Sequence, residues 1–193
     1  MRRLLCACIW TCMFLPSFAA SAWTALDVMA VDALWSGQCT IRMEAGVRMA
    51  DGFGLRIPFS CIRRLGSYDV TFLGGGVHLE YRPFENGLFV SFGVFEGGWF
   101  LGADRPQESG CLLNEMAFGY TWRFPSHWFV EPTIRIRDPS GVFATEQNRM
   151  EEAFGSYPMV RLSVLVGWES PASFLSTEPR RKRDGDGGGG DKR

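Results

Sequence analysis

Residues 38–49, Gln-Cys-Thr-Ile-Arg-Met-Glu-Ala-Gly-Val-Arg-Met, alternate strictly between two kinds of side chain. Every odd position is apolar, from Cys39 to Met49, and every even position is polar or glycine, from Gln38 to Arg48. A period of two places successive side chains on opposite faces of a β-strand. The twelve residues of this stretch exceed the roughly five or six of an ordinary soluble strand. The stretch therefore predicts a long strand with one apolar and one polar face.

The same alternation recurs along the chain and predicts six further strands. These stretches are 55–61, 77–82, 88–94, 115–124, 128–137 and 160–168. Tight turns separate some of them, because Asn86-Gly87 is a strong type I′ hairpin signal and Pro125-Ser126-His127 joins two alternating runs. Two connections are long, at 97–110 and 138–157, and the second is expected to hold a short helix over 145–154 that ends at Gly155. The sequence thus predicts an all-β, up-and-down antiparallel sheet.

The composition fits a β protein and excludes some functions. The chain has 193 residues with 23 glycines, 14% aromatic residues and a net charge of -1. That charge gives no general attraction to nucleic acid. The only lysines are Lys182 and Lys192, so 18 of the 20 basic residues are arginines. Arginine in place of lysine favours charges that are held in fixed pairs.

The N-terminus predicts export. Met1-Arg2-Arg3 is basic, residues 4–18 are apolar, and Ala20-Ser21-Ala22 offers small residues before a cleavage point at Trp23. The predicted division of the chain is a signal peptide over 1–22, an N-terminal segment of unassigned structure over 23–37, a β-barrel over 38–170 and a disordered tail over 171–193. The apolar residues of 23–35 are spaced more like a helix than a strand.

Three cysteines remain after the expected cleavage: Cys39, Cys61 and Cys111. An odd number allows at most one disulfide. Cys39 and Cys61 share the apolar parity, and a hairpin centred on Asp51 places them opposite or diagonal to one another. We expect them to be close but unbonded.

Long strands with one apolar and one charged face are typical of a transmembrane β-barrel of about eight strands. A soluble sandwich or lipocalin-type barrel also alternates. The membrane barrel is favoured by the length of the strands, by arginines and carboxylates suited to filling a narrow lumen, and by aromatic residues near the tight turns. The predicted lumen-lining residues are Arg42, Glu44, Arg48, Arg56, His78, Glu80, Arg82, Glu115, Arg123, Glu131, Arg135 and Arg161. The predicted aromatic girdle is Tyr81, Trp122, Phe124, Trp128 and Trp168.

Three segments resemble a known kind of protein: 81–93 (YRPFENGLFVSFG), 119–124 (GYTWRF) and 129–137 (FVEPTIRIR). They are similar to the small eight-stranded outer-membrane barrels of the OmpA, OmpX and OmpW kind, and to the small barrels of spirochaetes. The resemblance covers about residues 38–168 and implies a monomer in the outer membrane of a diderm bacterium, in contact with lipid and with the barrel-assembly machinery. It further implies a structural or surface-interaction role through the 97–110 and 138–157 loops, or passage of small solutes, hydrophobic ones included.

Seven strands are one short of an even number. The eighth is expected within 23–35 or 97–110, or from a split of one strand at Gly74-Gly75-Gly76. With the long loops outside the cell, the turns at 83–87 and 125–127 are expected on the periplasmic side.

The sequence does not favour catalysis. His78 lies on the polar face near Glu80, and His127 lies in a tight turn, but neither a GxSxG nor an HExxH motif is present. We expect no cofactor and no metal site. The alternatives are a lipid-modifying enzyme that uses His78, and a soluble periplasmic ligand-binding barrel.

Overall fold

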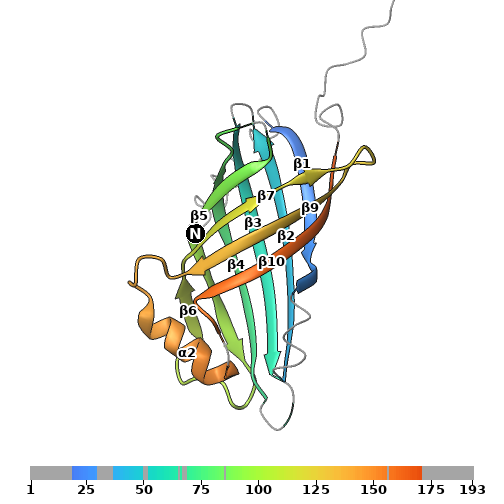
Figure 1. Cartoon of the computed structure of the whole chain (residues 1–193). Helices are drawn as coiled ribbons and strands as arrows, with labels where there is room; N and C mark the ends of the chain where they lie inside the picture. The colour runs from blue at the N-terminus through green and yellow to red at the C-terminus, as the bar shows by residue number, and fades with distance from the viewer. Residues whose placement is uncertain are drawn as a thin grey trace, which may run out of the picture.

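The chain forms a closed antiparallel β-barrel, shown in Figure 1. This computed structural model describes residues 19–29, 37–49, 52–64, 66, 69–84, 86–155 and 157–170. Residues 1–18 of the predicted signal peptide and the predicted tail 171–193 lie outside the described residues.

The strands and the helix follow one another with short gaps. The strands are β1 (Ala19–Asp27), β2 (Gln38–Met49), β3 (Phe53–Arg64), β4 (Thr71–Tyr81), β5 (Leu88–Leu101), β6 (Gly110–Leu113), β7 (Glu115–Tyr120), β8 (Trp122–Arg123), β9 (Trp128–Arg137) and β10 (Val160–Glu169), with helix α2 (Ala144–Phe154) between the last two. β6 and β7 both pair with β5, and β7 and β8 both pair with β9, so these three segments occupy one place in the sheet. The barrel therefore has eight strand positions.

The barrel closes between its first and last strands. β1 pairs with β2 on one side and with β10 on the other, and β10 pairs in turn with β9. A sheet closed in this way has no free edge among its strands. The six later predicted strands and the strand over 38–49 are all present, and β2 has the predicted bounds.

The eighth strand is β1, which includes part of the 23–35 segment, where the apolar residues are spaced more like a helix than a strand. Its side chains do alternate, but Trp23 and Ala25 point inward and Thr24 points outward. Only the middle of β1 departs from the usual order of this barrel, where the Trp23 ring packs over Gly46 of β2, since Ser21 and Asp27 also face inward and Leu26 faces outward. The other two candidate locations are wrong, since residues 74–76 lie within the single strand β4 and 97–110 contributes the end of β5.

The predicted signal-peptide boundary falls within this strand. Residues 19–22 form the first part of β1, where Ser21 donates a hydrogen bond to Glu169 of β10.

The two ends of the barrel differ. The tight connections lie at one end, together with the start of β1 and the end of β10, and the long loops and α2 lie at the other (Figure 1). Helix α2 ends as predicted at Gly155, which adopts φ 73°. Within the described ranges, no helix is long and apolar enough to cross a membrane.

Candidate functional site

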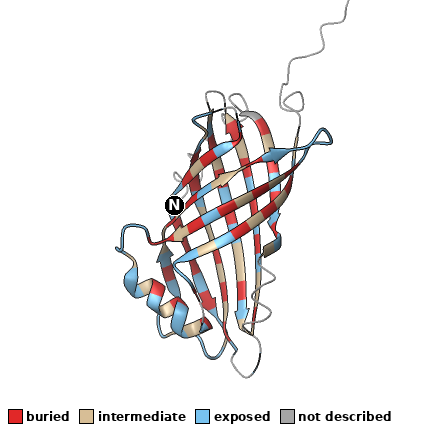
Figure 2. Cartoon of the chain, in the orientation of Figure 1, coloured by how far each residue is buried: buried red, intermediate tan, exposed pale blue. Residues whose placement is uncertain are grey.

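Buried and exposed residues alternate along the strands (Figure 2), and most of the charged residues of the strands are among the buried ones. The interior contains a network of arginines and carboxylates contributed by strands all around the barrel. Its ion pairs join Arg42, Arg48, Arg56, Arg82 and Arg135 to Glu44, Glu80, Glu115, Glu131 and Glu169. Guanidinium groups suit this setting, because the planar fork can reach two or three carboxylates at fixed angles.

Arg56 of β3 is the centre of the half of the network nearer the tight turns. Its Nη1 lies 3.0 Å from Glu44 of β2, its Nε donates to Glu80 of β4, and its Nη2 donates to Glu131 of β9. The guanidinium also lies 4.2 Å from the centroid of the Phe89 ring. One side chain thereby connects three strands and an aromatic face.

Glu44 and Glu115 form the part of the network nearer the loop end. Arg135 of β9 donates to Glu44 at 2.6 Å and to Glu115 at 2.8 Å. Arg42 of β2 contacts the same two carboxylates, at 3.0 Å and 2.6 Å. Because β2 and β9 are not neighbours in the sheet, these contacts cross the lumen.

Most of the residues predicted to line the lumen have buried side chains. The buried ones are Arg42, Glu44, Arg48, Arg56, His78, Glu80, Glu115, Glu131 and Arg135. Arg82 and Arg161 are partly buried, and Arg161 pairs with Asp27 of β1. Arg123 is a correction, because its side chain is 43% exposed and pairs with Glu169 at the barrel rim. The strand that holds it, β8, has only two residues and ends just before the tight turn.

Three further interior residues were not among the predicted lumen-lining residues, although Arg137 follows the alternation of its strand. Asp27 lies in the strand that had not been located, and Arg137 donates to the backbone oxygen of Pro158 at the end of β9. Glu96 of β5 is also buried. Simple alternation from Leu88 would place Glu96 on the outer face, so this residue could not be found from the pattern.

Apolar side chains close the lumen at the loop end. The cluster combines inward-facing residues of β3, β4, β5 and β6 with residues of α2 and its flanks: Ile62, Val70, Phe72, Phe100, Cys111, Met150, Phe154 and Tyr157. Helix α2 is fastened there, since Gln38 donates to the backbone oxygen of Phe154 and Arg64 donates to that of Ala153. Burial raises the pKa of Tyr157 to about 12, and the Arg137 guanidinium lies 3.6 Å from the centre of its ring.

A second apolar cluster lies towards the tight turns and comprises Trp23, Ala25, Phe129 and Leu165. Trp23 and Phe129 meet edge to face at 5.8 Å. Gly46 and Gly167 make room for these two rings, because a Cβ atom would lie 2.5 Å from Trp23 and 2.4 Å from Phe129. The described side chains thus fill the interior, with one apolar cluster at the loop end and a second among the charged residues towards the tight turns, where Arg48 and Arg56 lie over the Trp23 ring.

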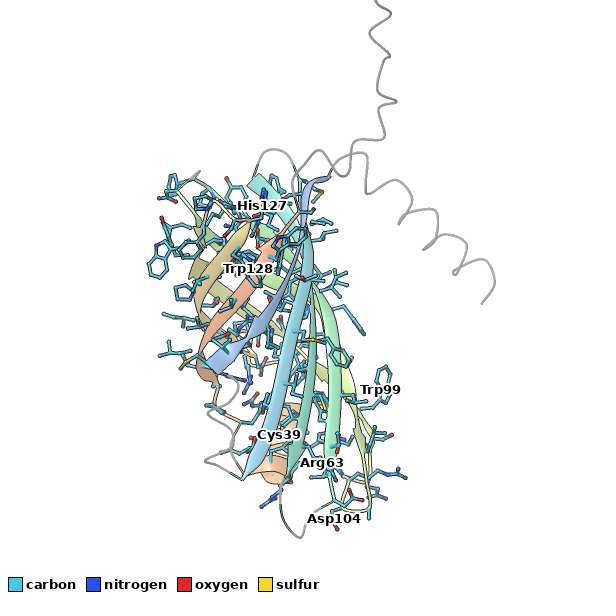
Figure 3. The ribbon with its side chains drawn as sticks, turned by 90° about the vertical axis from the view of Figure 1, so that its right-hand side faces the viewer. Cys39, Arg63, Trp99, Asp104, His127 and Trp128 are labelled. Atoms are coloured by element: carbon cyan, nitrogen blue, oxygen red, sulfur yellow. The ribbon has the colours of Figure 1, made fainter. Side chains whose placement is uncertain are left out.

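The outer face of the barrel is apolar. Large hydrophobic residues are exposed on strands all around it, including Leu26, Ile41, Met43, Ile57, Phe59, Leu79, Phe92, Trp99, Phe118, Ile134 and Leu162. The outer face also has an apolar groove of about 660 Å³, with Phe118, Ile134 and Leu162 among its lining residues. The predicted girdle residues Tyr81, Trp122, Phe124, Trp128 and Trp168 are exposed at or near the tight-turn end, where Figure 3 labels Trp128.

The cysteines and histidines lie in different surroundings. Cys61 pairs with Ile41 and Cys39 pairs with Arg63, so the two cysteines are diagonal neighbours, as predicted. All three described cysteines are free thiols. His127 is exposed in the tight turn with φ 66°, whereas His78 is buried in the lumen. Comparisons with protein-family models, with curated proteins and with solved structures gave no match.

Proposed function

We propose that this chain is an integral outer-membrane β-barrel of a diderm bacterium and acts as a surface-exposed structural or interaction protein. The observation that supports this most strongly is the inside-out distribution of its side chains, with the charges buried and the large hydrophobic residues exposed. In water each exposed apolar Å² costs about 25 cal/mol, whereas hydrocarbon removes that cost. A closed barrel also leaves no strand edge unpaired in lipid.

The unequal ends of the barrel support one orientation. In small outer-membrane barrels the short turns face the periplasm and the longer loops face outward. The loops at 102–109 and 138–159, with α2, would then be offered to partners at the cell surface. The aromatic residues near the tight turns would lie at the periplasmic interface of the membrane. The apolar groove on the outer face is suited to the acyl chains of outer-membrane lipid.

The filled interior favours a scaffold over a passage for solutes. A solute would have to displace the ion-paired arginines and also the apolar cluster that includes Phe154. His78 faces the lumen and is 1% exposed, so it is poorly placed to act on a lipid substrate. We expect no steady single-channel openings in planar bilayers, and such openings would support the passage role instead.

Insertion into lipid is tested by a pair of substitutions at exposed apolar residues. Met43 lies in the middle of β2 on the outer face, and Val142 lies in the loop before α2. An arginine on the lipid face costs about 2–4 kcal/mol near the bilayer midplane, so Met43→Arg should impair refolding into phospholipid vesicles and Val142→Arg should not.

The readouts are heat-modifiable migration in gels and fractionation of cells. We expect the wild-type chain in the outer membrane after a high-salt wash. Release by salt, or equal refolding of Met43→Arg and Val142→Arg without lipid or detergent, would support a soluble barrel and contradict the proposal.

A further inference from the structure

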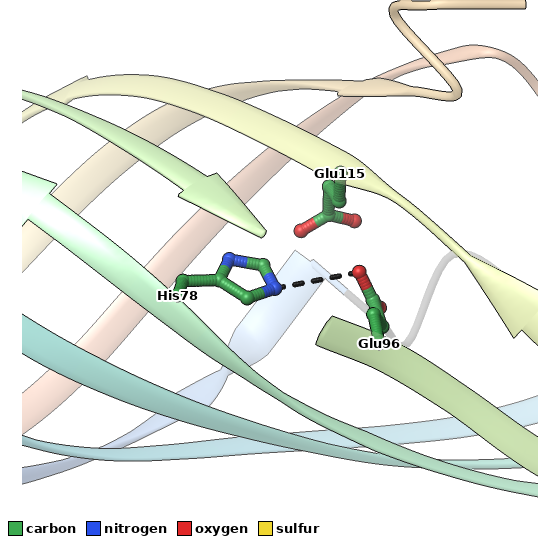
Figure 4. A group of neighbouring side chains, drawn as sticks. All are labelled: His78, Glu96 and Glu115. Atoms are coloured by element: carbon green, nitrogen blue, oxygen red, sulfur yellow. Dashed lines mark ion pairs between the residues drawn. The ribbon is translucent and has the colours of Figure 1, made fainter. Parts of the chain in front are cut away.

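His78 and Glu96 meet inside the barrel without a hydrogen bond between them. The Nε2 atom of His78 lies 3.3 Å from an Oε2 atom of Glu96, an ion pair if the imidazole is protonated (Figure 4). Both atoms are buried, and neither has a hydrogen-bond partner among the residues that the structure describes. Buried polar atoms are nearly always paired, since leaving one unpaired costs on the order of 1–3 kcal/mol. This pair is therefore incomplete, although the neighbouring lumen is densely ion-paired.

A third group, Glu115 of β7, lies against the same pair. One ligand atom from each of His78, Glu96 and Glu115 can be chosen so that all three lie within 4.8 Å of one another. Arg42 and Arg135 donate to Oε1 of Glu115 at 2.6 Å and 2.8 Å, whereas Oε2 accepts a longer bond of 3.2 Å from Arg42. A carboxylate has about four acceptor positions, so Glu115 can also coordinate an ion without losing its hydrogen bonds from both arginines.

An irregularity in β5 brings Glu96 into this position. Phe95 pairs with Val77 and Gly93 pairs with His78, which leaves Val94 as an extra residue. Such a bulge reverses the parity of the strand beyond it. Glu96 therefore points inward and lies opposite Gly76, where a Cβ atom would be 3.1 Å from the Glu96 backbone.

The chemistry of the three groups matches a divalent transition metal. We propose that His78, Glu96 and Glu115 bind a divalent first-row transition ion inside the lumen, with zinc as the best match. Imidazole nitrogen and carboxylate oxygen bind zinc at about 2.0–2.2 Å, which sets neighbouring tetrahedral ligands about 3.4 Å apart. The 3.3 Å between His78 and Glu96 agrees with that spacing. One imidazole with two carboxylates suits such ions better than calcium or magnesium, which prefer oxygen ligands alone.

The ion pairs around the site leave one carboxylate without an arginine of its own. Within the described part of the chain, Glu96 forms an ion pair with His78 and with no arginine. The arginines beside Glu115 are shared with Glu44. A bound ion would join β4, β5 and β7 at the middle of the barrel, a structural role in which the metal stabilises the folded state that binds it.

The test uses the untagged full chain, because His78 and His127 are then its only histidines. The chain is refolded in detergent with ZnCl₂, dialysed, and analysed for bound metal by mass spectrometry. We expect about one zinc per chain in the wild type and in His127→Gln, and at least a tenfold loss in His78→Gln. Retention of zinc by His78→Gln, or its loss in His127→Gln, would overturn the proposal.

A second measurement requires no change in the lumen. In His127→Gln protein refolded with Cu²⁺ as the probe, His78 is the only possible imidazole ligand. Pulsed electron paramagnetic resonance should then show coupling to the remote imidazole nitrogen. A folded, heat-modifiable barrel that lacks this coupling would refute the site even if His78→Gln does not fold.

Discussion

Replacing Arg56 by methionine tests whether the buried charges depend on one another. The side chain is 2% exposed and contacts Glu44, Glu80 and Glu131. Methionine keeps most of the apolar stem but removes the charge and its donors. The three carboxylates stay buried, so the change isolates the loss of their shared cation.

The expected cost follows from what each carboxylate retains. Removing one partner of a buried pair costs about 3–5 kcal/mol, because the remaining charge is left uncompensated. Glu44 keeps Arg135, and both Glu80 and Glu131 keep Arg82, which places the loss near the lower limit. Loss of the contact with an aromatic ring adds about 1 kcal/mol. We expect a total of about 3–4 kcal/mol, or roughly a 10²- to 10³-fold change in the unfolding equilibrium.

The measurement is equilibrium unfolding by urea in phospholipid vesicles, followed by tryptophan fluorescence and by heat-modifiable migration. Arg123→Met is the matched control, because the side chain of this arginine is 43% exposed and its one ion-pair partner among the described residues is Glu169. An exposed pair contributes about 0–1 kcal/mol. Adding Glu131→Gln to Arg56→Met should recover part of the loss, since one unpaired carboxylate is neutralised.

Equal costs for Arg56→Met and Arg123→Met, both below about 1 kcal/mol, would refute the reasoning. That result would mean that water reaches the interior carboxylates and screens them. The filled lumen proposed above would then also be wrong.

Three further predictions concern packing and pH. Gly46→Ala should destabilise the barrel by about 1–3 kcal/mol, because the new Cβ would lie 2.5 Å from the Trp23 ring. Gly110→Ala is the control, since its Cβ would meet no described atom within 4 Å; equal urea midpoints for the two variants would contradict this. Phe154→Ala should loosen α2, because it removes a side chain from the apolar cluster at the loop end. The expected result is faster cleavage by trypsin within α2. An unchanged cleavage rate would show that other contacts hold the helix. Burial raises the pKa of Tyr157 to about 12, so its contribution to the free energy of unfolding is complete below pH 10 and should fall by about 2–3 kcal/mol as the pH rises to 12 and beyond. Urea titrations of Tyr157→Phe should lack this loss. An identical pH dependence in both proteins would assign the loss to other groups.

The strands could be predicted because each face meets a different environment. From Gln38 to Met49 every inward position is polar or glycine and every outward one is apolar, so the alternation is visible without a structure. The pattern failed in β1, where Trp23 and Ala25 face inward and pack against other interior residues. Local sequence carries no sign of that packing, because the partner Gly46 lies on a different strand.

The candidate metal site was hidden for another reason. His78 and Glu115 lie at positions that the alternation of their strands places inward. Glu96 faces inward only because the extra residue Val94 reverses the alternation of β5. A bulge is a property of the pairing between β4 and β5, and no turn residue or glycine at Val94 marks it. The sequence can predict that charged residues face inward and form ion pairs. The grouping of His78, Glu96 and Glu115 becomes visible only when the register between β4 and β5 is known.

The interior network also selects the register of the strands. Moving β9 by one residue against its neighbours would turn Ile134 or Ile136 inward and Arg135 outward. Glu44 and Glu115 would then lose a shared partner, while a guanidinium would face the apolar side. Lysine could not replace Arg135 here, because its single ammonium lacks the two separated nitrogens that reach both carboxylates. The scarcity of lysine thus follows from the geometry: Arg42, Arg48, Arg56, Arg82 and Arg135 each connect two or more carboxylates, and they do so only in the correctly paired barrel.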